Sequence, residues 1–481
     1  MKRPLFLLAG PIAGLLVRFL LAHHGPDAAT MAGLVAWIAV WWISEAVPIA
    51  VTSLLPLVCF PLFGIAGLGD TAANYGKEII FLFLGGFLLA LGIERSGLHR
   101  RIALWTVLRL GGSPARLVLG IMVASALLSM WINSTATVLV MLPIALSLVD
   151  GLDEDHGRER LAVPLLLGVS YGASIGGMAT PVGTPPNLVL LQLWEELFPG
   201  RPRIGFGQWM SFGVPFAIVF LGLSWWLLVR WLEPVKGIQL EGRDAVRERL
   251  SELGRPTRDE RWSGIVFAIT ALLWVTGDGL SFGGLDLPGW RDVPMLAPVG
   301  DPAVAVAGAV LLFILPQAHG NGRLLEWAWA EKRLPWGVLL LIGAGMALAM
   351  GIARSGLDQV IGGAMQAFGN WPVPLMLLAL VGVVCLLSEL GSNTATASLV
   401  LPILARTAES WGSDPVLLLV PATLAASLGF MLPVASPMQT IVFATGRIPV
   451  RRMVRAGLWI DAAGAVALVA LYLLLGRLVF A

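Results

Sequence analysis

Long apolar runs follow one another along the whole chain, separated by short polar segments. They fall at about 4–22, 31–46, 49–66, 79–93, 117–149, 161–195, 211–232, 262–277, 301–316, 335–353, 373–405, 415–444 and 456–478. A helix needs about 20 residues to cross the hydrocarbon core of a bilayer, and most of these runs suit one crossing. The pattern predicts an all-α membrane protein that crosses the bilayer many times.

Two of the runs, 117–149 and 373–405, are too long for one crossing and carry polar residues near their middle. We interpret each as a re-entrant hairpin, in which two half-helices enter and leave the membrane on the same side. Lipid cannot satisfy the backbone at the tip of such a hairpin, so the tip must be surrounded by protein or water. When the hairpins are not counted as crossings, about 11 transmembrane helices remain.

The basic residues favour one orientation of this arrangement. If the N-terminus is cytoplasmic, 24 of the 32 Lys and Arg residues lie in segments on the cytoplasmic side, as the positive-inside rule requires. The odd number of crossings then places the C-terminus outside. Met1-Lys2-Arg3 could begin a signal peptide, but no small-residue cleavage site follows the apolar run, so we expect it to remain as the first span.

An internal repeat relates the two halves of the chain. The sequence Gly-Ile-Glu-Arg-Ser-Gly-Leu at 92–98 matches Gly-Ile-Ala-Arg-Ser-Gly-Leu at 351–357, and Thr135–Ile144 matches Thr394–Ile403, both at an offset of 259 residues. Each copy holds one hairpin and an odd number of crossings, so the second copy is inserted upside down. Inverted repeats with interrupted helices are typical of secondary transporters, which bind substrate near the bilayer midplane.

These patterns divide the chain into four regions. The expected regions are an N-terminal first span over 1–30, a first inverted repeat over 31–233, a cytoplasmic linker over 234–261 and a second inverted repeat over 262–481. The first repeat would hold a hairpin at about 117–149 and a broken helix at about 161–195. The second would hold a hairpin at about 373–405 and a broken helix at about 415–444.

Composition excludes several classes of protein. Only 13% of the residues are charged, against about 25% in soluble proteins, and the net charge of +2 gives no reason to expect a nucleic-acid partner. The two cysteines and five histidines form no metal or redox pattern, and no nucleotide-binding motif is present. We therefore expect neither an enzyme nor a bound cofactor.

Four polar tracts interrupt the apolar runs and carry the candidate chemistry. They are the two hairpin tips at 129–137 and 388–396 and the two helix breaks at 183–187 and 435–439, and they contain neither Lys nor Arg. Their hydroxyl and amide groups, with carbonyls freed by proline, are ligands for a small hard cation. The N-termini of half-helices attract anions. The tracts therefore predict one site that holds an anion together with its coupling cations.

Several of these motifs resemble the divalent anion/sodium symporter family. The tip Ser392-Asn393-Thr394 and its variant Asn133-Ser134-Thr135 carry the resemblance, as do Ser44-Glu45-Ala46-Val47-Pro48 and the stretch from Ser174 to Asn187. It extends over roughly 30–478. The resemblance implies an elevator-type homodimer, in which hairpins and broken helices move against a fixed scaffold. It also implies sodium-coupled transport of a divalent anion, with a C4-dicarboxylate such as succinate expected. The compact loops favour the inner (plasma) membrane of a bacterium.

The resemblance also assigns residues to the site. The substrate carboxylates would meet Asn133, Ser134, Thr135, Thr184, Ser392, Asn393, Thr394, Ser436 and Pro437. Sodium ions would be bound by Ser129, Ser134 and Gly183 at a first site and by Ser388, Gly391, Asn393 and Ala435 at a second.

Two departures from the family pattern leave alternatives open. The amide and the hydroxyl are exchanged in Asn133-Ser134, and Met438-Gln439 follows Pro437 where the family has a second proline and an asparagine. A sodium-independent anion exchanger, or a transporter of sulfate or another oxyanion with the same fold, therefore remains an alternative. Glu389, beside the second tip, could relay protons or fix the hairpin geometry by hydrogen bonding.

Overall fold

The computed structural model describes residues 3–150, 157–235, 243–282, 285–318, 322–365 and 371–480, and nearly all of its regular structure is helical. Residues 236–242 of the predicted linker lie outside the described residues. The all-α fold class is confirmed, and the described residues add one small strand pair, in which β1 (Leu280–Phe282) lies antiparallel to β2 (Leu285–Leu287). Gly283-Gly284 separates the strands in the sequence, and such a pair is typical of two-residue hairpin loops.

The first half of the chain forms the following helices. They are α1 (Arg3–Leu20), α2 (Pro26–Ser44), α3 (Ile49–Thr52), α4 (Leu55–Leu62), α5 (Leu68–Ala73), α6 (Glu78–Ser96), α7 (Leu98–Leu110), α8 (Pro114–Ser129), α9 (Ser134–Asp150), α10 (Gly157–Met178), α11 (Pro185–Leu197) and α12 (Phe206–Leu227). Single turns add η1 (Ala22–His24), η2 (Asn74–Gly76) and η3 (Leu228–Leu232).

The second half begins with α13 (Arg243–Glu252), which lies in the predicted linker. It continues with α14 (Arg258–Val275), η4 (Trp290–Asp292), α15 (Asp301–Ile314), α16 (Trp327–Ala330), α17 (Trp336–Ser355), α18 (Leu357–Met365), α19 (Val373–Leu390), α20 (Asn393–Ser410), α21 (Val416–Ala425), α22 (Pro437–Phe443), α23 (Val450–Leu471), η6 (Tyr472–Gly476) and α24 (Arg477–Phe480).

Among the described residues, seven helices are long and apolar enough to cross a membrane. They are Pro26–Ser44, Leu68–Ser96, Arg160–Met178, Phe206–Leu232, Trp336–Ser355, Val373–Leu390 and Val450–Phe480, and shorter apolar helices such as α1, α15 and the pair α3 and α4 accompany them. Because length and composition do not say which short helices cross the bilayer, the count of about 11 crossings stays a prediction.

The two long runs are each divided into two helices that contact one another. α8 and α9 are separated at 130–133, and α19 and α20 at 391–392. The other two polar tracts also interrupt helices, at 179–184 between α10 and α11 and at 426–436 between α21 and α22. Proline begins α11 and α22, where its missing N–H has no helical acceptor to lose.

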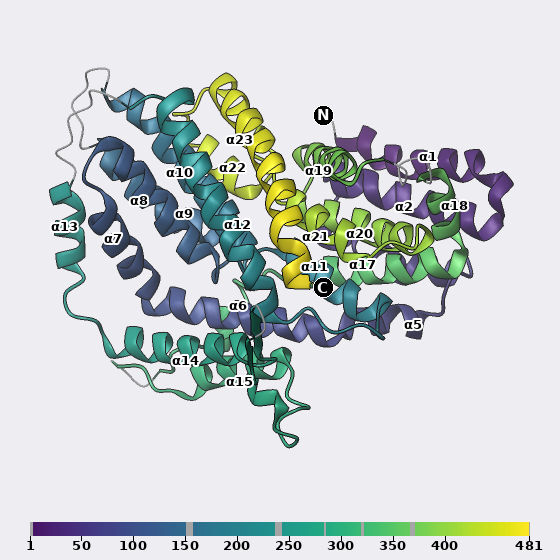
Figure 1. Ribbon diagram of the computed structural model, residues 1–481, viewed down its shortest axis with the longest axis horizontal. Coiled ribbons are helices and arrows are strands. Elements are labelled where there is room, and N and C mark those ends of the chain that lie inside the picture. Colours follow the sequence, from purple (N-terminus) through teal and green to yellow (C-terminus); the bar gives the residue numbers. More distant parts are fainter. Residues whose placement is uncertain are drawn as a thin grey trace.

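The second part of the broken helix in each half of the chain packs against helices of the other half. α11 from the first half packs against α20 and α21, whereas α22 from the second half packs against α9 and α10. Figure 1 shows the start of the chain, α1 and α2, lying beside α17–α20 on the right, and α7–α10 on the left. The four polar tracts therefore meet near the centre of the molecule, although they lie far apart in the sequence.

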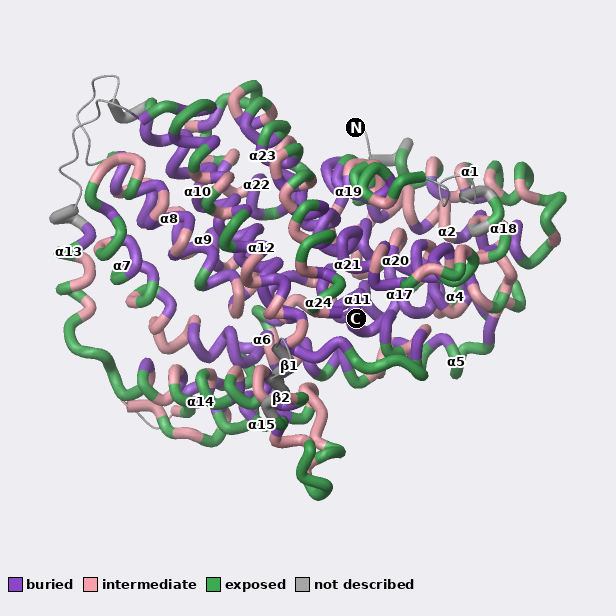
Figure 2. Tube along the Cα trace, in the orientation of Figure 1, coloured by how far each residue is buried: buried purple, intermediate pink, exposed green. Residues whose placement is uncertain are grey.

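Burial follows the expectation for a protein immersed in lipid. The interior helices are buried along most of their length (Figure 2), and residues 161–178 of α10 are all buried. α14 is different, because Val266 and Trp274 face the protein while Ile269 and Leu272 are exposed. An apolar face of this kind is stable when hydrocarbon covers it.

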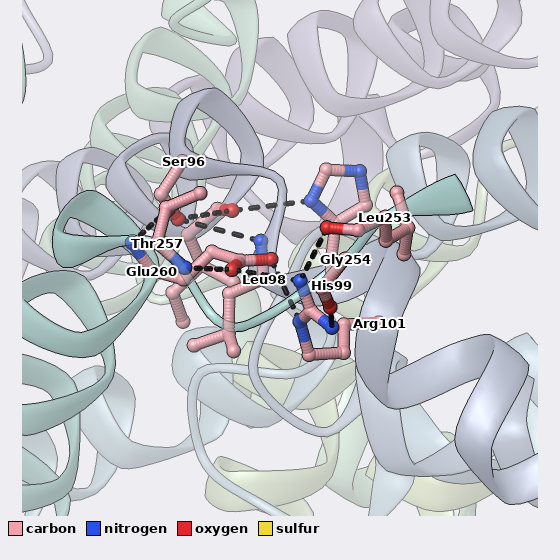
Figure 3. A network of polar contacts seen from close by, with 9 residues as sticks. Ser96, Leu98, His99, Arg101, Leu253, Gly254, Thr257 and Glu260 are labelled. Atoms are coloured by element: carbon pink, nitrogen blue, oxygen red, sulfur yellow. Dashed lines mark hydrogen bonds and ion pairs between the residues drawn. The ribbon is translucent and has the colours of Figure 1, made fainter. Parts of the chain in front are cut away.

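A charged clamp joins α7 of the first half to the start of α14 (Figure 3). Arg101 donates from Nε to Glu260 Oε1 at 3.0 Å and from Nη2 to Glu260 Oε2 at 3.1 Å. It also donates to the carbonyl oxygens of Leu253 and Gly254. Glu260 in turn accepts from the backbone N–H of Thr257 at 2.6 Å, which completes the N-terminal cap of α14.

We expect Arg101→Ala to destabilise the protein by on the order of 2 kcal/mol at neutral pH, because it leaves the buried Glu260 carboxylate without its cation. Burial raises the pKa of Glu260, but hydrogen bonds from Arg101 and Thr257 outweigh this and hold the pKa below its usual 4.5. The stabilisation is therefore present above that value and lost as the pH falls through the lowered pKa. Thermal unfolding in detergent at neutral and acidic pH measures it.

Arg100→Ala is the matched control, since Arg100 is the neighbouring exposed arginine. A melting temperature for Arg101→Ala equal to that of Arg100→Ala at neutral pH would contradict a stabilising role for the clamp.

Candidate functional site

A cavity of about 310 Å³ lies where the four polar tracts meet. The residues predicted for substrate all line it, namely Asn133, Ser134, Thr135, Thr184, Ser392, Asn393, Thr394, Ser436 and Pro437. Gly183 also lines it, whereas the sodium-site residues Ser129, Ser388, Gly391 and Ala435 are buried behind it. The structure thus brings together residues as far apart in the sequence as Asn133 and Pro437, which are separated by 304 positions.

The remaining wall comes from elements that no motif indicated. Ile49 at the start of α3 and Pro335, Gly337, Val338 and Leu341 at the start of α17 complete the lining with apolar surface. No lining residue is charged. A cavity of this size suits a small organic anion, whose charge must then be balanced by polar groups, helix termini and bound cations.

Among the helices that begin at the cavity wall, α9 at Ser134 and α20 at Asn393 offer backbone N–H groups. α11 offers only the positive end of its dipole, because its first residues, Pro185 and Pro186, have no N–H. The first N–H groups of a helix have no intrahelical acceptor, and the helix dipole makes this end positive. The cavity can therefore hold carboxylate oxygens without a Lys or Arg side chain. Ser436 adds a hydroxyl at the start of α22, where its Oγ accepts from the backbone N–H of Gln439 at 3.4 Å.

Oxygen atoms gather behind the second tip. Ser388 Oγ lies 2.6 Å from the carbonyl oxygen of Ala426 and 2.8 Å from Asn393 Oδ1. One hydroxyl proton can serve only one of these two acceptors, so the cluster has more oxygen lone pairs than protons. Such a group of neutral oxygens suits a small hard cation like sodium. Gly429 borders the cluster, because a Cβ there would lie 3.6 Å, an ordinary contact distance, from both Ser388 Oγ and Asn393 Oδ1.

The first tip also places a serine hydroxyl near a second side-chain oxygen and a backbone carbonyl, but here the second side chain is a serine instead of an asparagine. Ser129 Oγ lies 2.7 Å from Ser134 Oγ, which reaches the carbonyl oxygen of Ala173 at 3.5 Å. The break behind the tip is held by Asn187, whose Nδ2 donates to the carbonyl oxygen of Thr180 at 2.8 Å. Gly177 and Gly183 touch closely, because a Cβ on Gly183 would lie 2.5 Å from the Gly177 carbonyl oxygen.

The exchange of Asn133 and Ser134 now has a structural meaning. Ser129 and Ser134 correspond to Ser388 and Asn393 at the repeat offset of 259, so a hydroxyl stands where the second tip has an amide oxygen. The displaced amide of Asn133 instead accepts from the backbone N–H of Thr135 at 2.8 Å, at the start of α9. The first tip therefore offers a weaker oxygen ligand than the second.

Glu389 and Asp461 hold the loop at 426–436 from behind. The Glu389 carboxylate accepts from the backbone N–H groups of Met431 at 2.7 Å and Leu432 at 2.9 Å. Glu389 thus makes hydrogen bonds of the kind that a geometry-fixing role requires, and they join the second tip to this loop rather than the two arms of the hairpin. Asp461 accepts from the Phe430 N–H at 3.3 Å and was not predicted. Its signal in the sequence was an acidic residue in the apolar run 456–478.

Comparison with known proteins identifies the family. Residues 12–481 match the family model described as the sodium:sulfate symporter transmembrane region. The chain belongs to the divalent anion/sodium symporter family. It is a membrane transporter of this family, as the motifs at the two tips indicated.

Similar proteins include two named sodium-dependent dicarboxylate transporter SdcS. The one from Staphylococcus saprophyticus is 39% identical over 444 residues, covering 90% of this chain and 83% of the relative. The one from Staphylococcus aureus is 37% identical over 478 residues, covering 96% of this chain and 89% of the relative.

Two solved transporters share the fold of this symporter family member. The Neisseria gonorrhoeae MtrF structure superposes with a TM-score of 0.59 at 17% identity and covers 84% of this chain and 83% of that chain. The Alcanivorax borkumensis YdaH structure gives a TM-score of 0.54 at 16% identity and covers 84% and 88%. At these identities the likeness concerns the fold alone.

Proposed function

We propose that this family member transports a C4-dicarboxylate such as succinate together with sodium. The observation that carries the proposal is the uncharged cavity of about 310 Å³ at three helix N-termini, with an oxygen cluster behind each tip. Neutral oxygens attract cations, and helix N-termini attract carboxylates. The names of the staphylococcal relatives, sodium-dependent dicarboxylate transporters, support the same substrate and ion.

The proposed roles follow the geometry. The substrate carboxylates bind at Asn133, Ser134, Thr135, Thr184, Ser392, Asn393, Thr394, Ser436 and Pro437. One sodium ion binds at Ser129, Ser134 and Gly183, and a second at Ser388, Gly391, Asn393 and Ala435. Two cations beside a dianion leave the loaded site neutral, which lowers the cost of holding it within the membrane.

We further propose a homodimer in the inner membrane with about 11 crossings per protomer, a cytoplasmic N-terminus and an external C-terminus. In this orientation Lys332 and Arg333 place the start of α17 on the cytoplasmic side. The cavity borders that start at Pro335 and Gly337, and with the proposed orientation we therefore assign an inward-facing state. An elevator movement of the hairpins and broken helices against α6 and α17 would carry the site to the other side.

A sodium-independent anion exchanger is the second candidate. The Ser134 hydroxyl, in place of an amide oxygen, favours it, because loss of the stronger ligand weakens the first cation site. A transporter of sulfate or another oxyanion would use the same helix N-termini. The cation dependence of uptake separates symport from exchange.

Cross-linking tests the elevator movement. A Cβ built on Gly86 of α6 lies 3.9 Å from Cβ of Val182 in the break before α11, and disulfides need about 3.5–4.5 Å. We expect Gly86→Cys with Val182→Cys to form a disulfide on oxidation and to lose more than about 90% of dicarboxylate uptake, because the bond ties a moving element to the scaffold. A reductant should restore uptake.

The two single-cysteine variants are the matched controls, since the native Cys59 and Cys385 are buried. Full uptake by a double variant that is shown to be cross-linked would contradict relative movement of α6 and the first broken helix.

A further inference from the structure

One face of α1 is apolar and exposed. α1 and α2 lie side by side at one edge of the molecule (Figure 1). Ile12, Leu15 and Phe19 of α1 follow one another at intervals of about one helical turn, and each is more than half exposed. A continuous apolar face of this kind is stable when hydrocarbon covers it. This edge of the molecule therefore lies against the acyl chains of the bilayer.

One arginine interrupts this apolar surface. Arg18 is exposed in the last turn of α1, and within the part of the chain that the structure describes it forms no ion pair or hydrogen bond. Its Cβ would lie 3.1 Å from a Cβ placed on Gly33 of α2. The acidic residue of α2, Asp27, comes six residues before Gly33, about 9 Å along the helix. A guanidinium beside lipid-facing side chains extends toward the headgroups, where it meets anions and water.

A narrow groove of about 160 Å³ runs beside Arg18 between α1 and α2. Gly14 and Gly33 both line it, and the two helices touch there, because a Cβ on Gly14 would lie 2.8 Å from the Gly33 carbonyl oxygen. Most of the other lining side chains are apolar, among them Leu15, Leu34 and Phe63. The shape and the apolar walls of the groove suit a hydrocarbon chain.

The polar groups of the groove indicate what that chain carries at its end. The Thr30 hydroxyl already donates to the Pro26 carbonyl oxygen at 2.7 Å, which leaves Arg18 as the charged group that lacks a partner. Arginine binds phosphate oxygens through two parallel N–H bonds. Among the described residues that line the groove, none is acidic, so the groove offers nothing to the positive group of a zwitterionic lipid. A headgroup with net negative charge complements it better.

We propose that the groove between α1 and α2 binds an anionic phospholipid, with an acyl chain over Gly14 and Gly33 and the phosphate at Arg18. The lipid would join α1 to α2 on the side where their backbones approach most closely. In the orientation proposed above, Arg18 lies at the outer end of α1, so the lipid belongs to the outer leaflet. The site is far from the four polar tracts in the sequence and does not depend on which anion is transported.

Native mass spectrometry of the purified full-length protein counts the lipids bound. Phosphatidylglycerol and phosphatidylcholine with identical acyl chains are titrated separately. We expect the first phosphatidylglycerol to bind about fivefold more tightly than phosphatidylcholine, since one basic residue near the headgroups contributes about this factor. Arg18→Gln should abolish the difference, whereas Arg18→Lys, which keeps the charge, should retain part of it. Because this measurement needs no transport, its failure is distinct from failure of the proposed function.

Two further variants separate the groove from a general attraction between charges. Arg477→Gln removes another exposed arginine and should keep the wild-type preference. Leu15→Trp fills the groove and should weaken binding of both lipids at least about fourfold, the effect of one methylene group that is no longer buried. Equal binding of the two lipids by wild type, or a preference that survives in Arg18→Gln, would overturn the proposal. Separation of a dimer into monomers by Arg18→Gln would assign the groove to a second copy of the chain and would also overturn it.

Discussion

Asn393→Ala should reduce sodium-driven succinate uptake at least about fivefold and raise the sodium concentration needed for half-maximal uptake. Asn393 Oδ1 is one of the three oxygens gathered at Ser388, and the residue also begins α20 at the cavity. Its removal deletes a cation ligand and leaves the Ser388 hydroxyl with one acceptor fewer. A lost hydrogen bond in a buried polar site costs about 1–3 kcal/mol, which corresponds to a factor of about 5 to 150.

Matched substitutions at the two tips sharpen this test. Asn393→Ser gives the second tip the hydroxyl pair that Ser129 and Ser134 form at the first, so it should weaken sodium binding less than alanine does. Ser134→Asn makes the reverse change and should strengthen sodium dependence. Asn74→Ala is the control, because Asn74 is buried at η2 outside the cavity. Equal sodium dependence in Asn393→Ala, Asn393→Ser, Ser134→Asn and the control Asn74→Ala would rule out cation binding at the tips.

The second large effect is expected at Glu389. Glu389→Ala should abolish most transport and lower the melting temperature, because it leaves the N–H groups of Met431 and Leu432 without acceptors. Each unpaired buried donor costs about 1–3 kcal/mol. Uptake kinetics should show a rise in the sodium requirement that exceeds the change in succinate KM, since the loop contributes to the second oxygen cluster.

Glu389→Gln should lie between wild type and alanine, because one of the two accepting oxygens is replaced by an NH2 group, which donates and cannot accept from the second N–H. Glu409→Gln on the more exposed part of α20 is the control. Normal sodium dependence and normal stability in Glu389→Ala would show that the carboxylate has no positioning role.

Much of the candidate site could be predicted because its residues carry a short-range signal. The tips at 129–137 and 388–396 interrupt apolar runs, and the repeat offset of 259 pairs them. The outcome is visible in one cavity that all nine predicted substrate residues line. The hydroxyl pair at the first tip follows from the same repeat, because Ser134 aligns with Asn393 and Ser129 aligns with Ser388.

Other features depend on packing across the chain and leave no periodic signal. Asp461 meets Glu389 only because α23 crosses α19, and helix periodicity does not say which residues of two distant helices face each other. The apolar cavity wall at Ile49 and Pro335 also depends on packing between distant segments of the chain. The strands β1 and β2 lie between α14 and α15 in the chain, and the pair Gly283-Gly284 in the sequence was the local indication of them.

The central claim, sodium-coupled dicarboxylate transport, is tested most directly by labelled succinate uptake into proteoliposomes containing the wild-type protein. External sodium, potassium and choline should be compared, each with and without succinate inside. We predict uptake that rises steeply with external sodium and needs no internal dicarboxylate. Uptake that is equal in sodium and choline, and that occurs only when dicarboxylate is loaded inside, would contradict symport and identify an exchanger.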